Sequence, residues 1–145
     1  MLRKAGVAVL FLLIASLPLT GYAAGDASYF EGVWVGAWQG YKGSSHGQDV
    51  TIEIHKGSQE GVFKVEYSWG GVTTGSGMEN PPGSLKAKGT EEGDRFVFQW
   101  KNKQGRETTV TLKKHEDGKV EARLEKAGPI GSKERPYREG ILRRK

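Results

Sequence analysis

The chain contains no cysteine, which excludes disulfide bonds and lipid modification of a cysteine. Small exported domains commonly depend on disulfides or on a structural metal for their stability. The three histidines, His46, His55 and His115, lie in different segments, and their spacing matches no metal-binding motif. We therefore expect a domain that is stabilised by its hydrophobic core, with no metal and no cofactor.

Motifs typical of catalysis and of phosphate binding are also missing. The serine of Gly75-Ser76-Gly77 lies in a glycine-rich stretch without the helical pattern that follows a nucleophile elbow. Without such a helix, the same stretch lacks the N-terminal amides that hold phosphate. Acidic residues gather at 91–94 and 116–117, in turn sequences, and their carboxylates would act together only if the fold brought them into contact. We expect no catalytic residues and a protein that is not an enzyme.

One uncharged apolar run is present, at the N terminus. Arg3 and Lys4 precede the run at residues 5–19, and the small residues Gly21 and Ala23 follow it. This order is typical of a secretory signal peptide, and the run is too short for a good membrane span. We expect residues 1–24 to be a signal peptide and residues 25–145 to be one domain in the periplasm or outside the cell, with no membrane span after cleavage; a retained anchor is the alternative.

The net charge gives little indication of a nucleic-acid partner. It is +5 for the whole chain, and removal of Arg3 and Lys4 with the signal peptide lowers it by two, to +3. A mild excess of this size is more often a solubility feature than a nucleic-acid footprint. The basic tail at 138–145 could form a patch for nucleic acid or an anionic surface, but we favour solvated charge on an edge or outer face. We expect no nucleic-acid partner.

Short segments of alternating apolar and polar residues, separated by glycine-rich turns, make up the rest of the chain. No helical period is long enough to predict a helix, and Asp117-Gly118 is the strongest two-residue hairpin signal. Eight antiparallel strands with one apolar face must close or fold over to bury it. We predict an all-β, up-and-down barrel, with a two-sheet sandwich as the alternative. The predicted strands are 30–39, 50–54, 63–69, 85–87, 96–100, 108–112, 120–124 and 137–144.

The first of these segments provides the anchor of the core. Gly32, Trp34, Gly36 and Trp38 share one parity, so all four face the same side of the strand. Two indoles separated by glycines are expected to lie in the interior.

The Gly32-x-Trp34 pair resembles the fingerprint of the calycin superfamily, the lipocalin and avidin barrels. The resemblance implies that Trp34 closes one end of the barrel and that a cation from the last strand packs across it. Arg143 shares the parity of Ile141, so we expect Arg143 to make this cation–π contact. The chain lacks the other lipocalin motifs, and Gly36 stands where avidins have asparagine, so biotin binding is not implied.

A second resemblance carries no function. The pattern Trp34-x-Gly-x-Trp38, with Tyr67-Ser68-Trp69 later in the chain, is similar to small bacterial secreted domains of unassigned activity.

Twelve aromatic residues follow the signal peptide, and they carry the functional prediction. We expect a barrel that binds a small apolar or aromatic molecule, or a glycan, with residues 70–84 as a lid over its mouth. The alternative is a protein-interaction module, such as an envelope partner or an inhibitor of a secreted enzyme, whose interior is solid; an enzyme comes third. No feature predicts the oligomeric state. The residues expected at the ligand are Trp38, Tyr67, Trp69 and Trp100.

Overall fold

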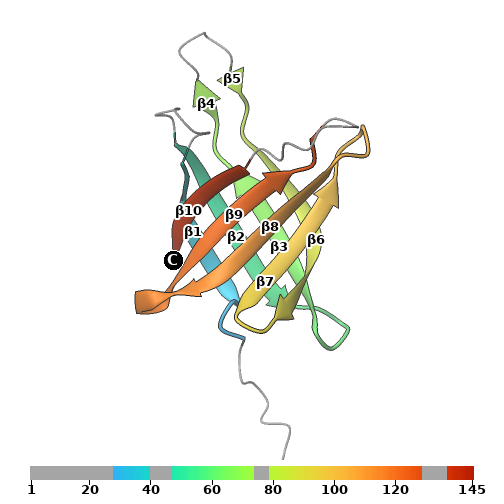
Figure 1. Cartoon of the computed structure of the whole chain (residues 1–145), viewed down its shortest axis with the longest axis vertical. Coiled ribbons are helices and arrows are strands. Elements are labelled where there is room, and N and C mark those ends of the chain that lie inside the picture. Colours follow the sequence, from blue (N-terminus) through green and yellow to red (C-terminus); the bar gives the residue numbers. More distant parts are fainter. Residues whose placement is uncertain (1–27, 40–46, 74–78, 129–136) are drawn as a thin grey trace, which may run out of the picture.

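Eight strands form a closed antiparallel barrel in the computed structural model, which describes residues 28–39, 47–73, 79–128 and 137–145 (Figure 1). Around the barrel the strand order is β1-β10-β9-β8-β7-β6-β3-β2. The predicted all-β up-and-down barrel is therefore confirmed, and the alternative of a two-sheet sandwich is wrong. The barrel strands are β1 (Gly32–Trp38), β2 (Gln48–Lys56), β3 (Val62–Trp69), β6 (Gly83–Glu92), β7 (Arg95–Lys101), β8 (Glu107–His115), β9 (Lys119–Lys126) and β10 (Tyr137–Arg144).

The connection between β3 and β6 differs from the predicted long loop. Its ends pair as two short antiparallel strands, β4 (Val72–Thr73) and β5 (Glu79–Asn80), which extend beyond the barrel (Figure 1). β6 begins at Gly83, inside the stretch predicted as loop, and is longer than the predicted strand at 85–87. Residues 74–78 lie outside the described part of the chain, so the predicted role of 70–84 as a lid stays a prediction.

The Asp117-Gly118 signal marks the connection between β8 and β9. The short 3₁₀ turn η1 (Glu116–Gly118) lies there, and Asp117 (φ 62°) and Gly118 (φ 69°) both adopt positive φ. Asp and Gly tolerate this left-handed conformation better than most residues. The predicted hairpin is therefore confirmed, but its connection contains three residues, Glu116–Gly118, and not two.

Alternation along each strand separates the barrel interior from its outer wall. Trp34 and Trp38 of β1 are both fully buried, as their shared parity predicts. The rest of the buried apolar core comes from six other barrel strands and from the segment before β1, while β6 contributes the partly buried Leu85 and Ala87. The buried residues are Phe30, Val50, Ile52, Ile54, Phe63, Val65, Tyr67, Phe96, Phe98, Val110, Leu112, Val120, Ala122, Leu124 and Leu142.

The seam between β1 and β10 closes the barrel, and Gly140 lies at its tightest point. A Cβ atom at Gly140 would lie 2.4 Å from the carbonyl oxygen of Ala37, closer than real Cβ atoms approach. Past this point the strands remain joined, because the Gln39 N–H donates to the Glu139 carbonyl oxygen at 2.7 Å. The face of β10 that carries Gly140 and Leu142 is therefore the one that turns inward.

One end of the barrel is closed by Trp34, Arg144 and the segment before β1. The register pairs Trp34 with Arg144, whose guanidinium carbon lies 4.4 Å from the Trp34 ring centre. Arg144 also donates to the carbonyl oxygen of Glu31 at 2.7 Å and to that of Tyr29. The Trp34 indole N–H donates to the Phe30 carbonyl oxygen at 2.8 Å, and the Phe30 side chain is fully buried.

This geometry corrects the assignment of Arg143. The predicted cation over Trp34 exists, but it is Arg144; Arg143 pairs with Val35 and is exposed. Ile141, whose parity suggested Arg143, lies on the outer wall and is 48% exposed. Gly32 supports the contact as a structural residue: its φ of 126° favours glycine, and a Cβ there would lie 3.0 Å from the Arg144 guanidinium.

Some predictions concern residues outside the described part of the chain or elements that it lacks. The signal peptide at 1–24 and His46 both lie outside the described residues. Within the described ranges, no helix is long and apolar enough to cross a membrane. The same ranges contain no group of three or more His, Asp or Glu side chains arranged to hold a metal ion.

Candidate ligand-binding site

A cavity of about 550 Å³ opens at the end of the barrel opposite Trp34. Here β3, β7 and β9 end, and β2, β6, β8 and β10 begin. These seven strands contribute residues near the ends of their inward-facing rows, and the adjoining turns complete the rim. The described residues that line the cavity are Gln48, Tyr67, Trp69, Pro81, Leu85, Trp100, Asn102, Arg106, Thr108, Leu124, Lys126, Ala127, Gly128 and Arg138.

Three aromatic rings form one wall of this cavity. The Tyr67 ring lies 5.3 Å from Trp69 and 5.3 Å from Trp100, in the second case nearly parallel, at 29°. Trp100 stacks in turn on Phe98 of the core at 6.0 Å. Trp69 and Trp100 are half-buried and Tyr67 is buried. The rings are therefore supported from below and present faces and edges to the cavity, which is the arrangement that an apolar or aromatic ligand requires.

Trp38 has a supporting position rather than the predicted contact with a ligand. It is fully buried and is not among the residues that line the cavity. Its indole N–H donates to the Tyr67 hydroxyl at 2.8 Å. Of the four aromatic residues predicted at the ligand, the structure thus brings Tyr67, Trp69 and Trp100 together at the mouth and places Trp38 beside Tyr67 in the core.

The Tyr67 hydroxyl remains a neutral hydrogen-bonding group. Burial raises the pKa of Tyr67 above its ordinary value of 10.0, against the opposing effects of the Trp38 hydrogen bond and the charge of Arg138. At neutral pH the hydroxyl therefore accepts from the indole and keeps its own proton as a donor.

A polar bridge connects three strands at the rim. The Gln48 side-chain N–H donates to the Gly70 carbonyl oxygen at 3.0 Å, and its side-chain oxygen accepts from Arg138 Nη1 at 2.7 Å. Gln48 is 9% exposed, so this amide is buried with both of its polar ends bonded. The bridge joins the start of β2, the end of β3 and the start of β10, and it orients the Arg138 guanidinium.

The polar lining residues are the part of the site that sequence reasoning missed. The sequence places Arg138 in a basic tail that is expected to be solvated, and Gln48 lies two residues before the predicted strand at 50–54. The sequence did contain a signal for both residues. Gln48 shares the parity of Val50 and Ile52, so it extends their inward-facing row by one residue. Arg138 extends the row of Leu142 in the same way.

Comparison with known proteins supports the fold of this chain and does not establish its function. No protein-family model matches the chain, and no curated protein sequence matches it. Among solved structures, the chain is similar to a de novo designed fluorescence-activating β-barrel, with a TM-score of 0.50 and 20% sequence identity over 82% of this chain and 96% of the designed one. At that identity, the similarity establishes that the chain is a small β-barrel of the same type.

Proposed function

We propose that this protein is an exported, non-catalytic binding protein that holds a small apolar or aromatic molecule in the cavity at the open end of its barrel. The observation that carries the proposal is the cavity itself, with Tyr67, Trp69 and Trp100 on one wall. Its volume of about 550 Å³ falls within the range of roughly 300–1,000 Å³ that is typical of small-molecule sites. The similar designed barrel is described as fluorescence-activating, which is compatible with a barrel of this fold holding a small molecule.

The competing protein-interaction function was predicted for a barrel with a solid interior. That description fits the half of the barrel around Trp34, where Phe30, Phe96 and Phe98 are packed without exposure to solvent. It does not fit the half around Tyr67, where the cavity lies. The position of the hollow therefore favours a small ligand over a purely external partner.

A calycin-like relationship is part of the proposal. Its support is the Gly32-x-Trp34 pair together with Arg144 across the indole at the closed end. The resemblance implies that Trp34 closes one end of the barrel, and the cavity of this chain lies at the end away from Trp34.

Fluorescence titration with phenylnaphthylamine, a neutral aromatic probe, tests the proposal. We expect saturable binding with a change in tryptophan emission, and Trp69→Ala should weaken it by about 1–2 kcal/mol, a factor of roughly five to thirty, while the variant still unfolds cooperatively. Tyr137→Ala is the control, because Tyr137 is an aromatic residue of the outer wall, 46% exposed. A panel of lipids and neutral oligosaccharides, titrated in the same way, identifies the preferred class. No response to any class would overturn the proposal.

A further inference from the structure

At the open end of the barrel, the inner surface carries positive charges and the outer wall carries carboxylates. Among the described residues that line the cavity, Arg106, Lys126 and Arg138 carry positive charge, and none is a carboxylate or a histidine. Three like charges around one cavity repel each other, and a low-dielectric aromatic wall strengthens that repulsion. The positive potential in the cavity therefore favours the binding of a negatively charged group.

Strand parity shows how this sorting arises. On β9 the inward row Val120, Ala122 and Leu124 continues to Lys126 at the rim. On β10 the inward row runs from Arg138 at the rim through Gly140 to Leu142. Both rows change from apolar to cationic at the height of the cavity.

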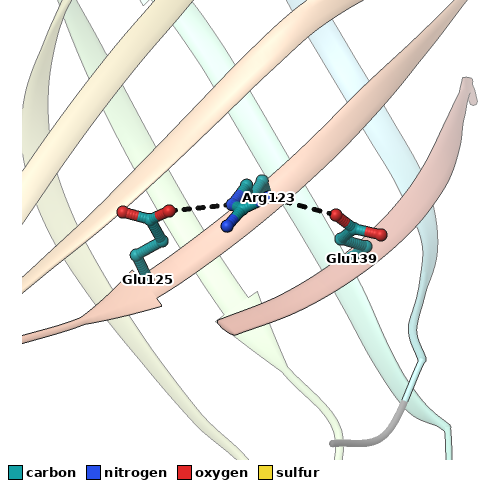
Figure 2. Close-up of polar contacts among 3 residues, drawn as sticks. All are labelled: Arg123, Glu125 and Glu139. Carbon is teal, nitrogen blue, oxygen red and sulfur yellow. Dashed lines mark hydrogen bonds and ion pairs between the residues drawn. The ribbon is translucent and has the colours of Figure 1, made fainter. Parts of the chain in front are cut away.

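The outer wall at the same height has the opposite arrangement. Figure 2 shows Arg123 of β9 between two carboxylates, Glu125 at 2.8 Å and Glu139 at 3.3 Å. The Arg123 guanidinium also lies 4.1 Å from the centre of the Tyr137 ring. Glu125 and Glu139 therefore lie on the outside of the barrel, where they neutralise Arg123.

The rim fixes the guanidinium of one cavity cation, Arg138, and the backbone of a second, Arg106. Arg138 donates to the buried Gln48 amide at 2.7 Å, and the amide is fixed in turn by the Gly70 carbonyl. Arg106 follows a turn organised by Asn102, whose side-chain oxygen accepts from the backbone N–H groups of Gln104 at 3.0 Å and Arg106 at 2.9 Å. Such preorganisation reduces the entropy lost when a ligand binds.

We propose that the cavity selects amphipathic anions, molecules whose carboxylate or sulfonate group lies among Arg138, Arg106 and Lys126 while their apolar body packs on Trp69 and Trp100. This inference rests on the proposed function, because it names the class of ligand that the same cavity takes. A guanidinium matches a planar, two-oxygen anion especially well. The apolar part has Leu85 and Leu124 as further partners in the lining.

A matched pair of probes tests the inference. Anilinonaphthalene sulfonate and phenylnaphthylamine share the same ring systems and differ in the sulfonate. We expect the sulfonate to bind at least about tenfold more tightly, although it is the less apolar molecule, because charge-assisted hydrogen bonds contribute a factor of about ten to a hundred. Its advantage should shrink as salt is raised, since salt screens the attraction.

Charge variants locate the effect. Arg138→Gln should weaken sulfonate binding about tenfold and change phenylnaphthylamine binding less than about twofold. Arg123→Gln removes the same charge from the outer wall and should change neither. Should Arg138→Gln fail to fold, the double variant Arg106→Gln and Lys126→Gln alters two exposed side chains instead and should give the same selective loss.

The outcomes separate this inference from the proposed function. Equal affinity for the two probes, or equal losses in Arg138→Gln and Arg123→Gln, would overturn the anion selectivity and leave the binding of apolar molecules standing. Binding of neither probe would overturn both. Weakening of both probes by Trp69→Ala places them in the cavity, and an unchanged affinity in that variant would overturn the assignment of the site.

Discussion

The two ends of the barrel differ, although β1 and β10 contribute a tryptophan and an arginine to each of them. β1 places Trp34 toward one end and Trp38 toward the other, and β10 does the same with Arg144 and Arg138. At the closed end Arg144 lies over Trp34, and Phe30 fills the interior behind it. At the other end the corresponding tryptophan is buried beside Tyr67, and the corresponding arginine lines a cavity.

The difference comes from the segment that precedes β1. Its backbone carbonyls at Tyr29 and Glu31 accept hydrogen bonds from Arg144, and the Tyr29 ring lies 5.9 Å from that of Trp34. The arginine is thus used for packing and closure. At the open end Arg138 bonds the Gln48 side chain at the rim, where its charge also faces the cavity. One cation stabilises the closed end, and the other lines the cavity at the open end.

Trp34→Ala should have the largest effect and should separate stability from binding. Removal of a fully buried indole leaves a large void, and we expect the free energy of unfolding to fall by about 3–5 kcal/mol in a denaturant melt. Any folded fraction should still bind phenylnaphthylamine with its usual affinity, because the cavity lies at the other end. A loss below about 1 kcal/mol would mean that Trp34 does not anchor the closed end.

Tyr67→Phe should have an intermediate effect, because it probes the layer beneath the cavity. The substitution keeps the ring but removes the acceptor of the buried Trp38 indole N–H. A buried donor left without a partner costs about 1–3 kcal/mol, which a denaturant melt would detect. Tyr137→Phe, on the outer wall, should leave the melt unchanged. Equal melts for the two variants would show that this hydrogen bond does not stabilise the open half.

Arg144→Ala should have the smallest effect of the three, and it tests which arginine closes the barrel. We expect a loss of about 1–2 kcal/mol in the free energy of unfolding from the cation–π contact and the hydrogen bonds to the segment before β1. Arg143→Ala should change it by little, since Arg143 pairs with Val35 on the outer wall and not with Trp34. Thermal or denaturant melts of both variants decide the matter, and a larger loss for Arg143→Ala would reverse the assignment.

Alternation along the chain was enough to predict the barrel, because each strand has one apolar row that leaves few choices of face. In the last strand, β10, alternation alone does not decide which face turns inward. Both of its rows contain an apolar residue and arginines, with Ile141 in one and Leu142 in the other. The choice between them depends on the seam, where only Gly140 fits against the Ala37 carbonyl. That is a contact between chain segments far apart in the sequence, which local alternation does not report.

The candidate site was predictable in its aromatic part and not in its charged part. Tyr67, Trp69 and Trp100 end apolar rows next to turns, so their position at a mouth follows from the strand pattern. A cation at the end of such a row has the same local pattern whether it points into a cavity or into solvent. The parity that Arg138 shares with Leu142 becomes informative only through the register, which pairs Arg138 with the buried Leu124 of the neighbouring strand β9 and so shows that this row faces inward.

The pairing of β1 with β10 also sets the order in which the barrel can assemble. Arg144 and Glu31, which are hydrogen-bonded at the seam, are separated by 113 residues, whereas the other barrel strands pair with a partner one connection away in the chain. Because closing a loop costs more entropy when the loop is longer, we expect neighbouring strands to pair first and the seam between β1 and β10 to form last. Until β10 arrives, β1 and β9 each have an unpaired edge that can recruit another chain. Completion of the C-terminal strand is thus the step that ends the protein's exposure to aggregation while it folds.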